Sequence, residues 1–439
     1  MLTDPEVLAS YVVDWTGRFR GWTDAVVRPG SAAEVAGVVA ICRDGGIALT
    51  LQGGNTGLVG GSVPLAGEIV LSLKRLSTLG DVDVVGGQVT AGCGVTIGAV
   101  QRAARAAGWA YGVDLASRDS ASVGGTIATN AGGLRVLRYG DTRAQLLGVE
   151  AVLGDGSVIS HLGGLWKDNT GYDLSGLLCG SEGTLGVVTA ARLRLVPPAP
   201  GRAVALLAFD DVTEAIVAAT SLRRWVALLE AVELFLGAGM ALVCSQFGLA
   251  SPFPAAPGDR PYAAYVLVEA AGAEDSTEML ASAVDSLSGV RDIALGSSGA
   301  RRAALWRYRE AHTDAIARLG VAHKLDVSVP LERLGELVSR VAGVVEASAP
   351  GATTWLFGHA ADGNLHVNIT GADPADDALD GAVLELVASL GGSISAEHGV
   401  GVAKRRWLGL NRSASELAAM RAVKRALDPA GILSPNVLL

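Results

Sequence analysis

The glycine-rich segment QGGNTGLVGGSVP, residues 52–64, constrains the fold more than any other stretch of the chain. Apolar, strand-like sequences flank it, IALTL before and EIVLSL after, which argues against a flexible linker. Glycine lets a backbone turn tightly and approach a ligand closely, and successive N–H groups in such a loop can form an anion-binding nest. A wide turn between two strands is the alternative interpretation.

The segment before this loop predicts a helix followed by a strand. Ser31 can cap a helix, apolar residues from Val35 to Cys42 recur on one face, and Gly45–Gly46 can end it. The loop itself has neither the Gly-Lys pair of a Walker loop nor the Gly-x-Gly-x-x-Gly spacing of a Rossmann fingerprint. The glycines at 92–98 also have the wrong spacing, and we interpret them as the start of a helix.

Two further glycine-rich segments follow, at residues 112–141 and 177–198. The first is rich in Ser, Thr, Asn and Gly and poor in acidic residues, which suits donors that face phosphates or a polar ring. In the second we expect Ser181 or Thr184 to cap a helix before a β-prone run that ends in prolines. Phosphate-binding candidates so far apart in the sequence indicate a large, extended cofactor.

Size and charge exclude several classes of protein. A chain of 439 residues predicts two or three domains, and an apolar fraction of 50% predicts real cores. The net charge of −9 and the lack of a Lys/Arg block argue against a nucleic-acid partner. Four scattered cysteines without a Cys-x-x-Cys pair favour a reducing compartment, and the N-terminus has no signal-peptide pattern.

The most apolar window, residues 225–244, contains Glu230 and Glu233. Carboxylates are costly in the middle of a membrane, so we expect an amphipathic core helix here and no transmembrane segment. These features predict a cytoplasmic protein, and peripheral membrane contact stays open.

Residues 300–320 predict a helix, and Arg309 and Thr313 share one of its faces. The strand HKLDVSVP follows, in which Lys324, Asp326 and Ser328 point to one side. Two cations and a hydroxyl group could bind a carboxylate. The alternative is a solvated helix face and a Lys324–Asp326 pair.

Three of the six histidines lie between residues 359 and 398. Asp362-Gly363 predicts a hairpin turn that would bring His359 and His366 together, and Asn368 lies two residues beyond His366 on the same face of the strand. One histidine on each arm of a turn is good ligand geometry for Zn²⁺ or a similar ion.

The adjacent pair Glu397 and His398 completes this cluster, and adjacent side chains diverge in an extended chain. We therefore expect one of them on a metal and the other facing substrate. The alternative is two hydrogen-bonded core histidines and a surface Glu-His pair. His312 and His323 are interpreted as structural.

The long motifs QGGNTGLVGGSVP, SVGGTIATNAGGLRVLRYG, KDNTGYDL and GSEGTLG resemble the flavin-binding half of the vanillyl-alcohol-oxidase type FAD enzymes. More narrowly, the chain resembles the FAD-linked D-2-hydroxyacid dehydrogenases, a family that includes D-2-hydroxyglutarate dehydrogenase, D-lactate dehydrogenase and the glycolate oxidase flavin subunit. The run NAGGLRVLRYG followed by KDNTGYDL is most similar to the hydroxyglutarate branch, and the ending DPAGILSPN fits as well.

The resemblance implies an α+β fold. It predicts a two-subdomain FAD-binding domain at residues 1–200, an α/β substrate-capping domain at 201–395, and a segment at 396–439 that returns to the flavin domain. The FAD should be non-covalent, because the first loop contains no histidine. The residues implied to bind FAD are Gly53, Gly54, Asn55, Thr56, Gly57, Gly60, Gly61, Ser62, Asp114, Ser122, Gly125, Thr126, Thr129, Asn130, Gly132, Gly183 and Asn436.

The resemblance also implies roles at the active site. The substrate carboxylate would be held by Arg309, Thr313 and Lys324, with Asn368 and His398 as further substrate contacts. The residues implied to bind a divalent metal, expected to be zinc, are His359, His366 and Glu397.

The implied reaction is oxidation of a D-2-hydroxy acid to the 2-oxo acid. His398 would act as general base, and hydride would pass from C2 to flavin N5. D-2-hydroxyglutarate, giving 2-oxoglutarate, is the expected substrate, with D-lactate or another short acid as the alternative. The expected electron acceptor is an electron-transfer flavoprotein or a quinone. Two other classes stay open, a zinc hydrolase and an FAD-binding protein without catalysis. The sequence does not determine the metal or the oligomeric state.

Overall fold

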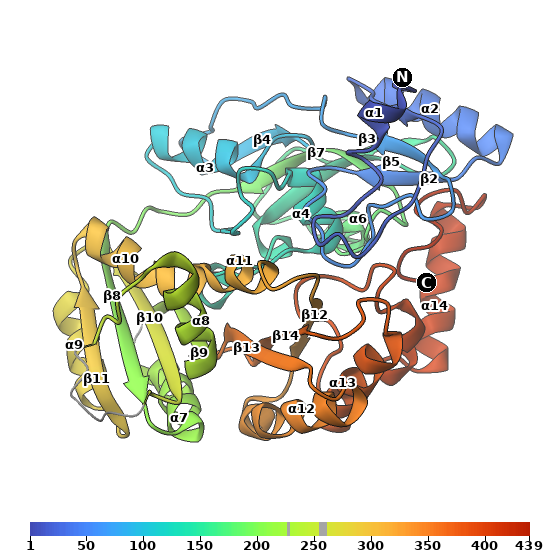
Figure 1. Ribbon diagram of the computed structural model, residues 1–439. Coiled ribbons are helices and arrows are strands. Elements are labelled where there is room, and N and C mark those ends of the chain that lie inside the picture. Colours follow the sequence, from blue (N-terminus) through green and yellow to red (C-terminus); the bar gives the residue numbers. More distant parts are fainter. Residues whose placement is uncertain (226–228, 254–260) are drawn as a thin grey trace. The chain divides into compact units, whose positions relative to one another are not determined.

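The computed structural model describes residues 1–225, 229–253 and 261–439, and it divides into two compact units (Figure 1). Unit 1 comprises Met1–Gly133, Tyr139–Pro198 and Glu397–Leu439. Unit 2 comprises Leu134–Arg138 and Ala199–Ala396. The chain therefore leaves unit 1 twice, first for the five residues Leu134–Arg138 and then for Ala199–Ala396, and both segments belong to unit 2.

Unit 1 contains a parallel sheet of order β1-β3-β2 and an antiparallel sheet of order β4-β7-β5-β6. The strands are β1 (Val26–Val27), β2 (Leu49–Gln52), β3 (Ile69–Ser72), β4 (Gln88–Gly92), β5 (Leu146–Val152), β6 (Val158–Ser160) and β7 (Val187–Arg194). The helices are α1 (Pro5–Leu8), α2 (Ala32–Gly45), α3 (Ile97–Ala106), α4 (Val123–Thr129), α6 (Leu174–Leu178) and α14 (Ala414–Leu427). Helix α5 (Val136–Tyr139) lies where the chain re-enters unit 1, and short 3₁₀ turns lie at Arg143–Gln145 and Arg405–Leu410.

Local signals in the sequence define α2 as expected. Ser31 caps it by accepting a hydrogen bond from the backbone N–H of Glu34, and Gly46 ends it in the left-handed conformation at φ 62°. Val35, Val39 and Cys42 are buried on one face, in a core that includes residues of both sheets.

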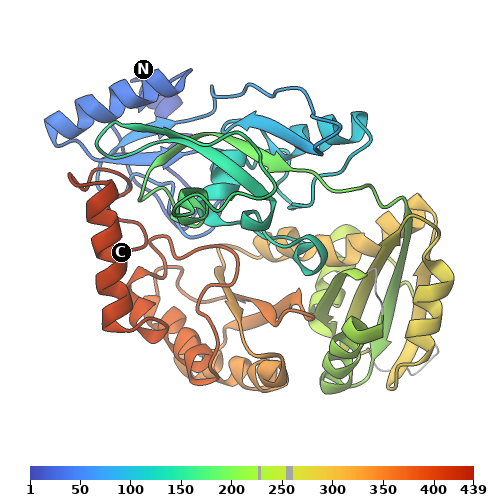
Figure 2. The same ribbon diagram turned by 180° about the vertical axis from the view of Figure 1, so that it is seen from behind.

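The end of the chain adds to the same core, as expected. Leu49 of β2 donates from its N–H to the carbonyl of Ile432, and Ser434 donates back to the carbonyl of Leu49, each at 2.8 Å. Ile432 and Leu433 are buried in the core of unit 1. They follow helix α14 in the chain, which is drawn in red in Figures 1 and 2. The C-terminal segment thus belongs to unit 1, and it extends a strand that lies 380 residues earlier in the chain.

Unit 2 is built on a seven-stranded antiparallel sheet of order β11-β8-β10-β9-β13-β14-β12. The strands are β8 (Gly201–Phe209), β9 (Leu229–Leu236), β10 (Ala264–Gly272), β11 (Val290–Gly296), β12 (His323–Ser328), β13 (Thr353–His359) and β14 (Asn364–Thr370). The helices are α7 (Val212–Trp225), α8 (Gly237–Phe247), α9 (Thr277–Asp285), α10 (Gly299–Glu310), α11 (His312–Ala317), α12 (Leu334–Ser348) and α13 (Asp377–Ser389), with a 3₁₀ turn at Leu331–Arg333.

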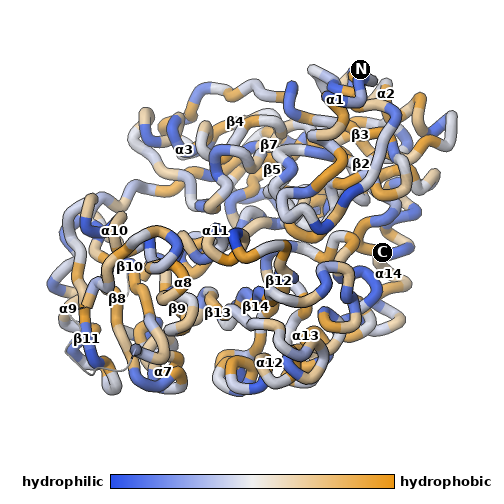
Figure 3. The backbone as a smooth tube through the Cα atoms, viewed as in Figure 1, coloured by the Kyte–Doolittle hydropathy of each residue, from blue (hydrophilic) through white to orange (hydrophobic). Residues whose placement is uncertain are grey.

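In chain order the first four strands, β8 to β11, lie in the ferredoxin-like sheet order β11-β8-β10-β9, and helix α8 is inserted between β9 and β10. Nearly every residue of β8, β9 and β10 is buried, and Figure 3 shows hydrophobic residues along these strands. Helices α8, α10 and α11 contribute Met240, Leu305 and Ile316 to the apolar core on one face. Helices cover both faces, which explains why the central strands lack the alternating pattern of a half-exposed sheet.

Three predictions of local structure are wrong. The window 225–244 is not one helix, because β9 occupies Leu229–Leu236 and α8 begins at Gly237. The predicted helix at 300–320 is two helices, α10 and α11, separated at Ala311. The helix before β7 is capped by Asp173, whereas the N–H and the hydroxyl of Thr184 both donate to the carbonyl of Ser181 in the following turn.

Each error has a physical reason. The strand β9 is buried on both faces, so its apolar run has no period that distinguishes it from a core helix. No proline or glycine marks the break at Ala311, which only the packing of the two helices imposes. Asp, Ser and Thr are all good caps, so sequence alone did not single out Asp173.

Candidate active site

The first glycine-rich loop, residues 53–62 of unit 1, is held open by its own polar side chains. Asn55 lies in the left-handed region at φ 58°, and its Nδ2 donates to the carbonyl of Val13 at 2.9 Å. The Ser62 hydroxyl donates to Oδ1 of Asn55 at 2.8 Å. The side chains of these two predicted cofactor residues thus shape the loop.

The glycines of this loop differ in what surrounds them. A Cβ on Gly53 would collide with the hydroxyl of Ser122, and a Cβ on Gly54 would collide with the carbonyl of Ser120. At Gly57, by contrast, no heavy atom of the described residues lies within 4 Å of the Cβ position. The loop therefore packs closely on the second glycine-rich segment at Gly53 and Gly54 and leaves room at Gly57.

The second segment forms α4, which Ser122 caps by accepting from the N–H of Gly125 at 3.3 Å. Asn130 ends the helix at φ 50°, just before Gly132. The hydroxyl of Thr129 donates to the carbonyl of Gly125 at 3.1 Å. The hydroxyl of Thr126 is buried and bonded to Val123, so this predicted cofactor residue has a structural contact within the helix.

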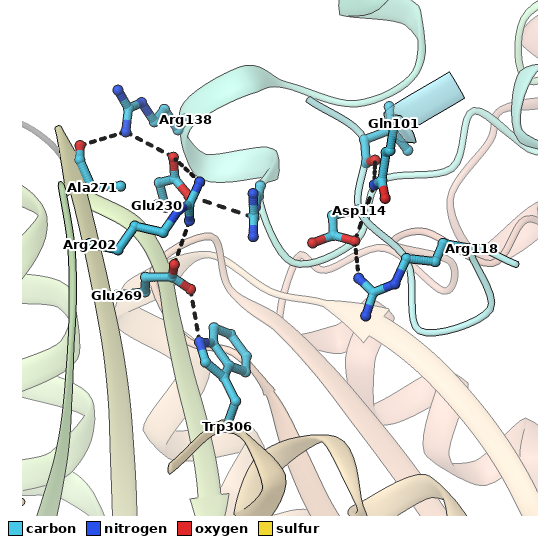
Figure 4. A network of polar contacts seen from close by, with 11 residues as sticks. Gln101, Asp114, Arg118, Arg138, Arg202, Glu230, Glu269, Ala271 and Trp306 are labelled. Atoms are coloured by element: carbon cyan, nitrogen blue, oxygen red, sulfur yellow. Dashed lines mark hydrogen bonds and ion pairs between the residues drawn. The ribbon is translucent and has the colours of Figure 1, made fainter. Parts of the chain in front are cut away.

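The remaining predicted cofactor residues also belong to unit 1. Asp114 accepts hydrogen bonds from Arg118 and from Gln101, as Figure 4 shows. Gly183 adopts φ 75° in the turn before β7. The side-chain amide of Asn436 donates to the carboxylate of Glu68. The other members of the predicted set, Thr56, Gly60 and Gly61, lie in the first loop.

In unit 2, the strand register brings four of the predicted site residues to one face of the sheet: Lys324, Asn368, His359 and His366. Cross-strand partners in an antiparallel sheet point to the same face. Three rows of partners therefore share a face: Lys324, Asn368 and Trp355; Asp326, His366, Phe357 and Phe235; and Ser328, Asn364, His359 and Glu233. The predicted common orientation of Lys324, Asp326 and Ser328 is confirmed.

The predicted hairpin is also confirmed, with β13 and β14 joined by a turn in which Gly363 adopts φ 78°. The rings of His359 and His366 lie 5.3 Å apart at an interplanar angle of 82°. One ring nitrogen of each lies within 4.8 Å of the other. Two imidazoles at this spacing can bind one metal ion.

A buried carboxylate lies at Nδ1 of each of these two histidines. Glu233 Oε1 lies 2.6 Å from Nδ1 of His359, and Asp326 Oδ1 lies 3.2 Å from Nδ1 of His366. Such a partner places the proton on Nδ1 and the lone pair on Nε2, which is the arrangement found around metal-binding histidines. The donor set of unit 2 therefore fits a divalent metal.

Arg309 lies at the end of α10, almost fully buried. Its Nε donates to Oε2 of Glu233 at 2.7 Å, and its guanidinium lies 4.6 Å from the centre of the Phe357 ring. Burial opposes ionisation of Glu233, but its contacts with His359 and with the Arg309 guanidinium outweigh that effect and lower its pKa. Glu233 is therefore ionised and fixes the orientation of Arg309.

Lys324 and Thr313 complete the predicted acid-binding group. Lys324 Nζ donates to Oδ1 of Asn368 at 3.4 Å, and burial lowers the pKa of Lys324, opposed by the charge of Asp314. Thr313 precedes Asp314 on α11 and is half-buried. Asp326 accepts from Nδ2 of Asn364 at 2.7 Å, and its Oδ1 lies 3.2 Å from Nδ1 of His366.

Glu397 and His398 are described with unit 1, directly after Ala396 at the end of unit 2. Glu397 Oε1 accepts a hydrogen bond from the N–H of Gly133 at 3.0 Å. Both side chains are partly buried. Their roles as metal ligand and base stay predictions.

The other two buried histidines have different surroundings. His312 packs between Phe235 and Phe357, and burial, together with the charge of Arg309, lowers its pKa to about 3, so it stays neutral. His323 lies 2.7 Å from Asp380 and 2.8 Å from the carbonyl of Asp373. These contacts hold secondary structure elements of unit 2 together.

Sequence reasoning missed Glu233, and it gave Asp326 a different partner. The available signal was a carboxylate inside the apolar run LLEAVELFL, where a buried charge needs a partner. That partner, His359, lies 126 residues away in the sequence. Nothing local in the sequence indicates the pairing.

Comparison with known proteins identifies the family. The FAD binding domain family matches residues 23–161, and the family described as FAD linked oxidases, C-terminal domain, matches residues 199–438. Among the described residues, no helix combines the length and the hydropathy needed to cross a membrane.

Two curated relatives match along the whole chain. The mitochondrial D-2-hydroxyglutarate dehydrogenase of Bos taurus is 39% identical, and the match covers 100% of this chain and 81% of that protein. The D-2-hydroxyglutarate dehydrogenase of Xanthomonas citri pv. viticola is also 39% identical, over 99% of this chain and 93% of the relative.

A solved structure of 4-ethylphenol oxidase from Gulosibacter chungangensis shares the fold, with a TM-score of 0.75 at 20% identity, over 98% of this chain and 92% of the oxidase. That similarity shows the two-domain fold of the vanillyl-alcohol-oxidase type. The family matches and the two curated relatives show that this chain is an FAD-dependent dehydrogenase acting on a hydroxyl group and belongs to the FAD-linked D-2-hydroxyacid dehydrogenase family.

Proposed function

We propose that this protein oxidises D-2-hydroxyglutarate to 2-oxoglutarate, using FAD and a divalent metal. The observation that carries the proposal is the polar face of the unit 2 sheet. On this face, His359 and His366 each lie beside a carboxylate, and Lys324 lies on the same face. A doubly charged acid with a hydroxyl group next to one carboxylate suits such a surface. The full-length similarity to two D-2-hydroxyglutarate dehydrogenases supports this choice.

Arg309, Thr313 and Lys324 are proposed to hold the carboxylates of the substrate, with Asn368 as a further contact. Glu233 accepts from Nε of Arg309, and the two terminal nitrogens of the guanidinium would bind a substrate carboxylate in a bidentate manner. Burial of Lys324 disfavours its charged form, and an anionic substrate would restore that form. The cation and the substrate charge therefore stabilise each other in a site that excludes water.

His359, His366 and Glu397 are proposed to hold the metal, which we expect to be Zn²⁺. Two neutral imidazoles and one carboxylate are a common ligand set for catalytic zinc, which keeps a further position for substrate or water. A bound divalent ion would lower the pKa of a hydroxyl group that it coordinates. His398 is proposed to take the proton from the substrate hydroxyl as general base, since imidazole titrates near neutral pH.

FAD is proposed to bind non-covalently to the three glycine-rich segments of unit 1, and when bound it supplies the hydride acceptor at N5. The close approach of Gly53 and Gly54 to the segment at Ser120–Ser122 supports this placement. The electron acceptor that reoxidises the flavin is proposed to be an electron-transfer flavoprotein or a quinone. Reoxidation of the substrate-reduced enzyme by each of the two acceptors, measured separately, tests that choice.

An anaerobic flavin-reduction assay tests the substrate. The purified protein is mixed with D- and L-2-hydroxy acids of varied length and charge, and flavin bleaching near ~450 nm is followed. We expect the fastest bleaching with D-2-hydroxyglutarate and none with its L-enantiomer. Faster bleaching with D-lactate would reassign the substrate, and no bleaching by any acid would refute the dehydrogenase.

Removal of the metal tests its role. Treatment with a chelator, followed by gel filtration, should abolish flavin reduction and leave the flavin absorbance unchanged, and added Zn²⁺ should restore the rate. Full activity in protein shown to be metal-free by elemental analysis would exclude the metal from the reaction.

A further inference from the structure

We propose that Glu233 is a positioning residue that fixes both the metal-binding histidine His359 and the substrate-binding arginine Arg309. The proposal rests on the proposed function for the roles of those two partners. The geometry itself lies entirely within unit 2: one carboxylate oxygen faces His359 Nδ1 at 2.6 Å, and the other accepts from Arg309 Nε at 2.7 Å.

The surroundings leave this carboxylate little freedom. Glu233 is 1% exposed, and it lies on β9 opposite His359 of β13. The ring of Phe357 packs against the Arg309 guanidinium and also against the ring of His366. The positions of the arginine and of both histidines are therefore set by one packed cluster.

A purely stabilising ion pair is a poor explanation for this arrangement. Desolvating two charges costs several kcal/mol, and replacing a buried ion pair with apolar residues is often neutral or favourable for stability. The strand around Glu233 is otherwise apolar, so a hydrophobic residue would fit there. A buried carboxylate that divides its two oxygens between two functional groups is better explained by positioning.

The second histidine provides an independent argument, because it has the same kind of partner. Asp326 is fully buried and lies 3.2 Å from Nδ1 of His366. Asn364 donates to the same oxygen of Asp326 at 2.7 Å and thereby orients it. A carboxylate at Nδ1 of both histidines directs both Nε2 atoms to a ligand, which a single chance contact would not do.

The chemistry of the pair predicts how substitution acts. Arg309 Nε–H is a donor, and His359 donates from Nδ1 when its Nε2 binds metal. A glutamine at position 233 offers one acceptor and one NH₂ group, so it can satisfy only one of them. If the NH₂ group faces His359, the ring proton moves to Nε2, and that nitrogen can no longer bind a metal.

The test uses the flavin-loaded, metal-free protein and Zn²⁺ alone as probe, with affinity measured by competition against a chromophoric chelator. We expect Glu233→Gln to weaken Zn²⁺ binding by about 10–100-fold. In the metal-saturated enzyme it should also raise the KM for D-2-hydroxyglutarate. Glu230→Gln is the matched control, since Glu230 is a buried carboxylate of the same strand that pairs with Arg138 and Arg202.

Arg309→Gln separates the two roles. It should raise KM and leave Zn²⁺ affinity within about threefold, because Glu233 still holds His359. Glu233→Asp keeps the charge and is the second variant if Glu233→Gln does not fold, as judged by flavin content and melting. It should also weaken Zn²⁺ binding, since the shorter side chain cannot reach both partners.

The outcomes are distinct. Unchanged Zn²⁺ affinity in a folded Glu233 variant, or equal loss in the Glu230 control, would overturn the positioning role. If D-2-hydroxyglutarate is not a substrate but Zn²⁺ binding still weakens, the role of Glu233 toward His359 stands and only the proposed substrate fails. The zinc measurement needs no turnover, so the two failures cannot be confused.

Discussion

Glu230 anchors the short excursion that the chain makes into unit 2 at Leu134–Arg138. The carboxylate is fully buried and accepts from Arg138 at 2.9 Å and from Arg202 at 2.6 Å, with Arg135 at 3.6 Å (Figure 4). Arg138 also donates to the carbonyl of Ala271 at 2.7 Å. We predict that Glu230→Gln loosens this segment.

The magnitude follows from the contacts. Two hydrogen bonds to a charged group contribute about 1.5–3 kcal/mol each, and the glutamine retains one neutral bond of about 1 kcal/mol, so the loss is about 3 kcal/mol. For a domain of about 150–250 residues, this loss lowers Tm by roughly 6–12 °C. If the loss falls on the excursion alone, the population of its open form rises by about 100-fold.

Limited proteolysis with trypsin measures this opening directly, because the segment carries Arg135 and Arg138. The protein is digested under native conditions, and cleavage after these residues is followed by mass spectrometry. The cleavage rate should rise by one to two orders of magnitude in Glu230→Gln. Glu269→Gln is the matched control: Glu269 pairs with Arg202 and Trp306 of the same network and contacts neither trypsin site in the described residues.

An unchanged cleavage rate in Glu230→Gln would refute the assignment of Glu230 as the anchor. Equal acceleration in the Glu269 variant would show that the whole network, and not this carboxylate, holds the segment. Melting followed by circular dichroism accompanies the digestion, so a global loss of stability is recognised and separated from local opening.

Three further predictions concern the proposed site. His398→Ala should lower kcat by about 10²–10⁴-fold while flavin content, read from absorbance, stays unchanged; full activity would remove its role as base. Gly53→Ala should destabilise the protein, because its Cβ collides with Ser122, whereas Gly57→Ala should melt like the parent protein. Lys324→Met should raise the free energy of unfolding at pH 7, because burial lowers the pKa of Lys324 and its charged form is costly. That gain should shrink as pH rises toward 10.5, where the unfolded chain also loses the proton, and denaturant titration across this range checks it.

The sequence determined the features that depend on neighbouring residues. Ser31 begins α2 and Gly46 ends it, and Asp362-Gly363 forms the turn of the hairpin that brings His359 and His366 together. Caps and turns depend on residues close in the sequence, so the sequence alone can predict them. The alternation of Lys324, Asp326 and Ser328 placed all three on one face of β12 for the same reason. The long glycine motifs were sufficient to identify the family.

Only the tertiary structure decided what lies opposite those residues. Glu233 meets His359 because β9 pairs with β13 in a sheet whose strand order no local pattern encodes. The same buried strand was mistaken for a helix, since a run that is apolar on both faces carries no period. Asp326 meets His366 and Asn364 of the neighbouring strand β14, contacts that its sequence neighbours do not indicate. Local signals fix elements, whereas the partners of a buried charge are fixed by register and burial across distant parts of the chain.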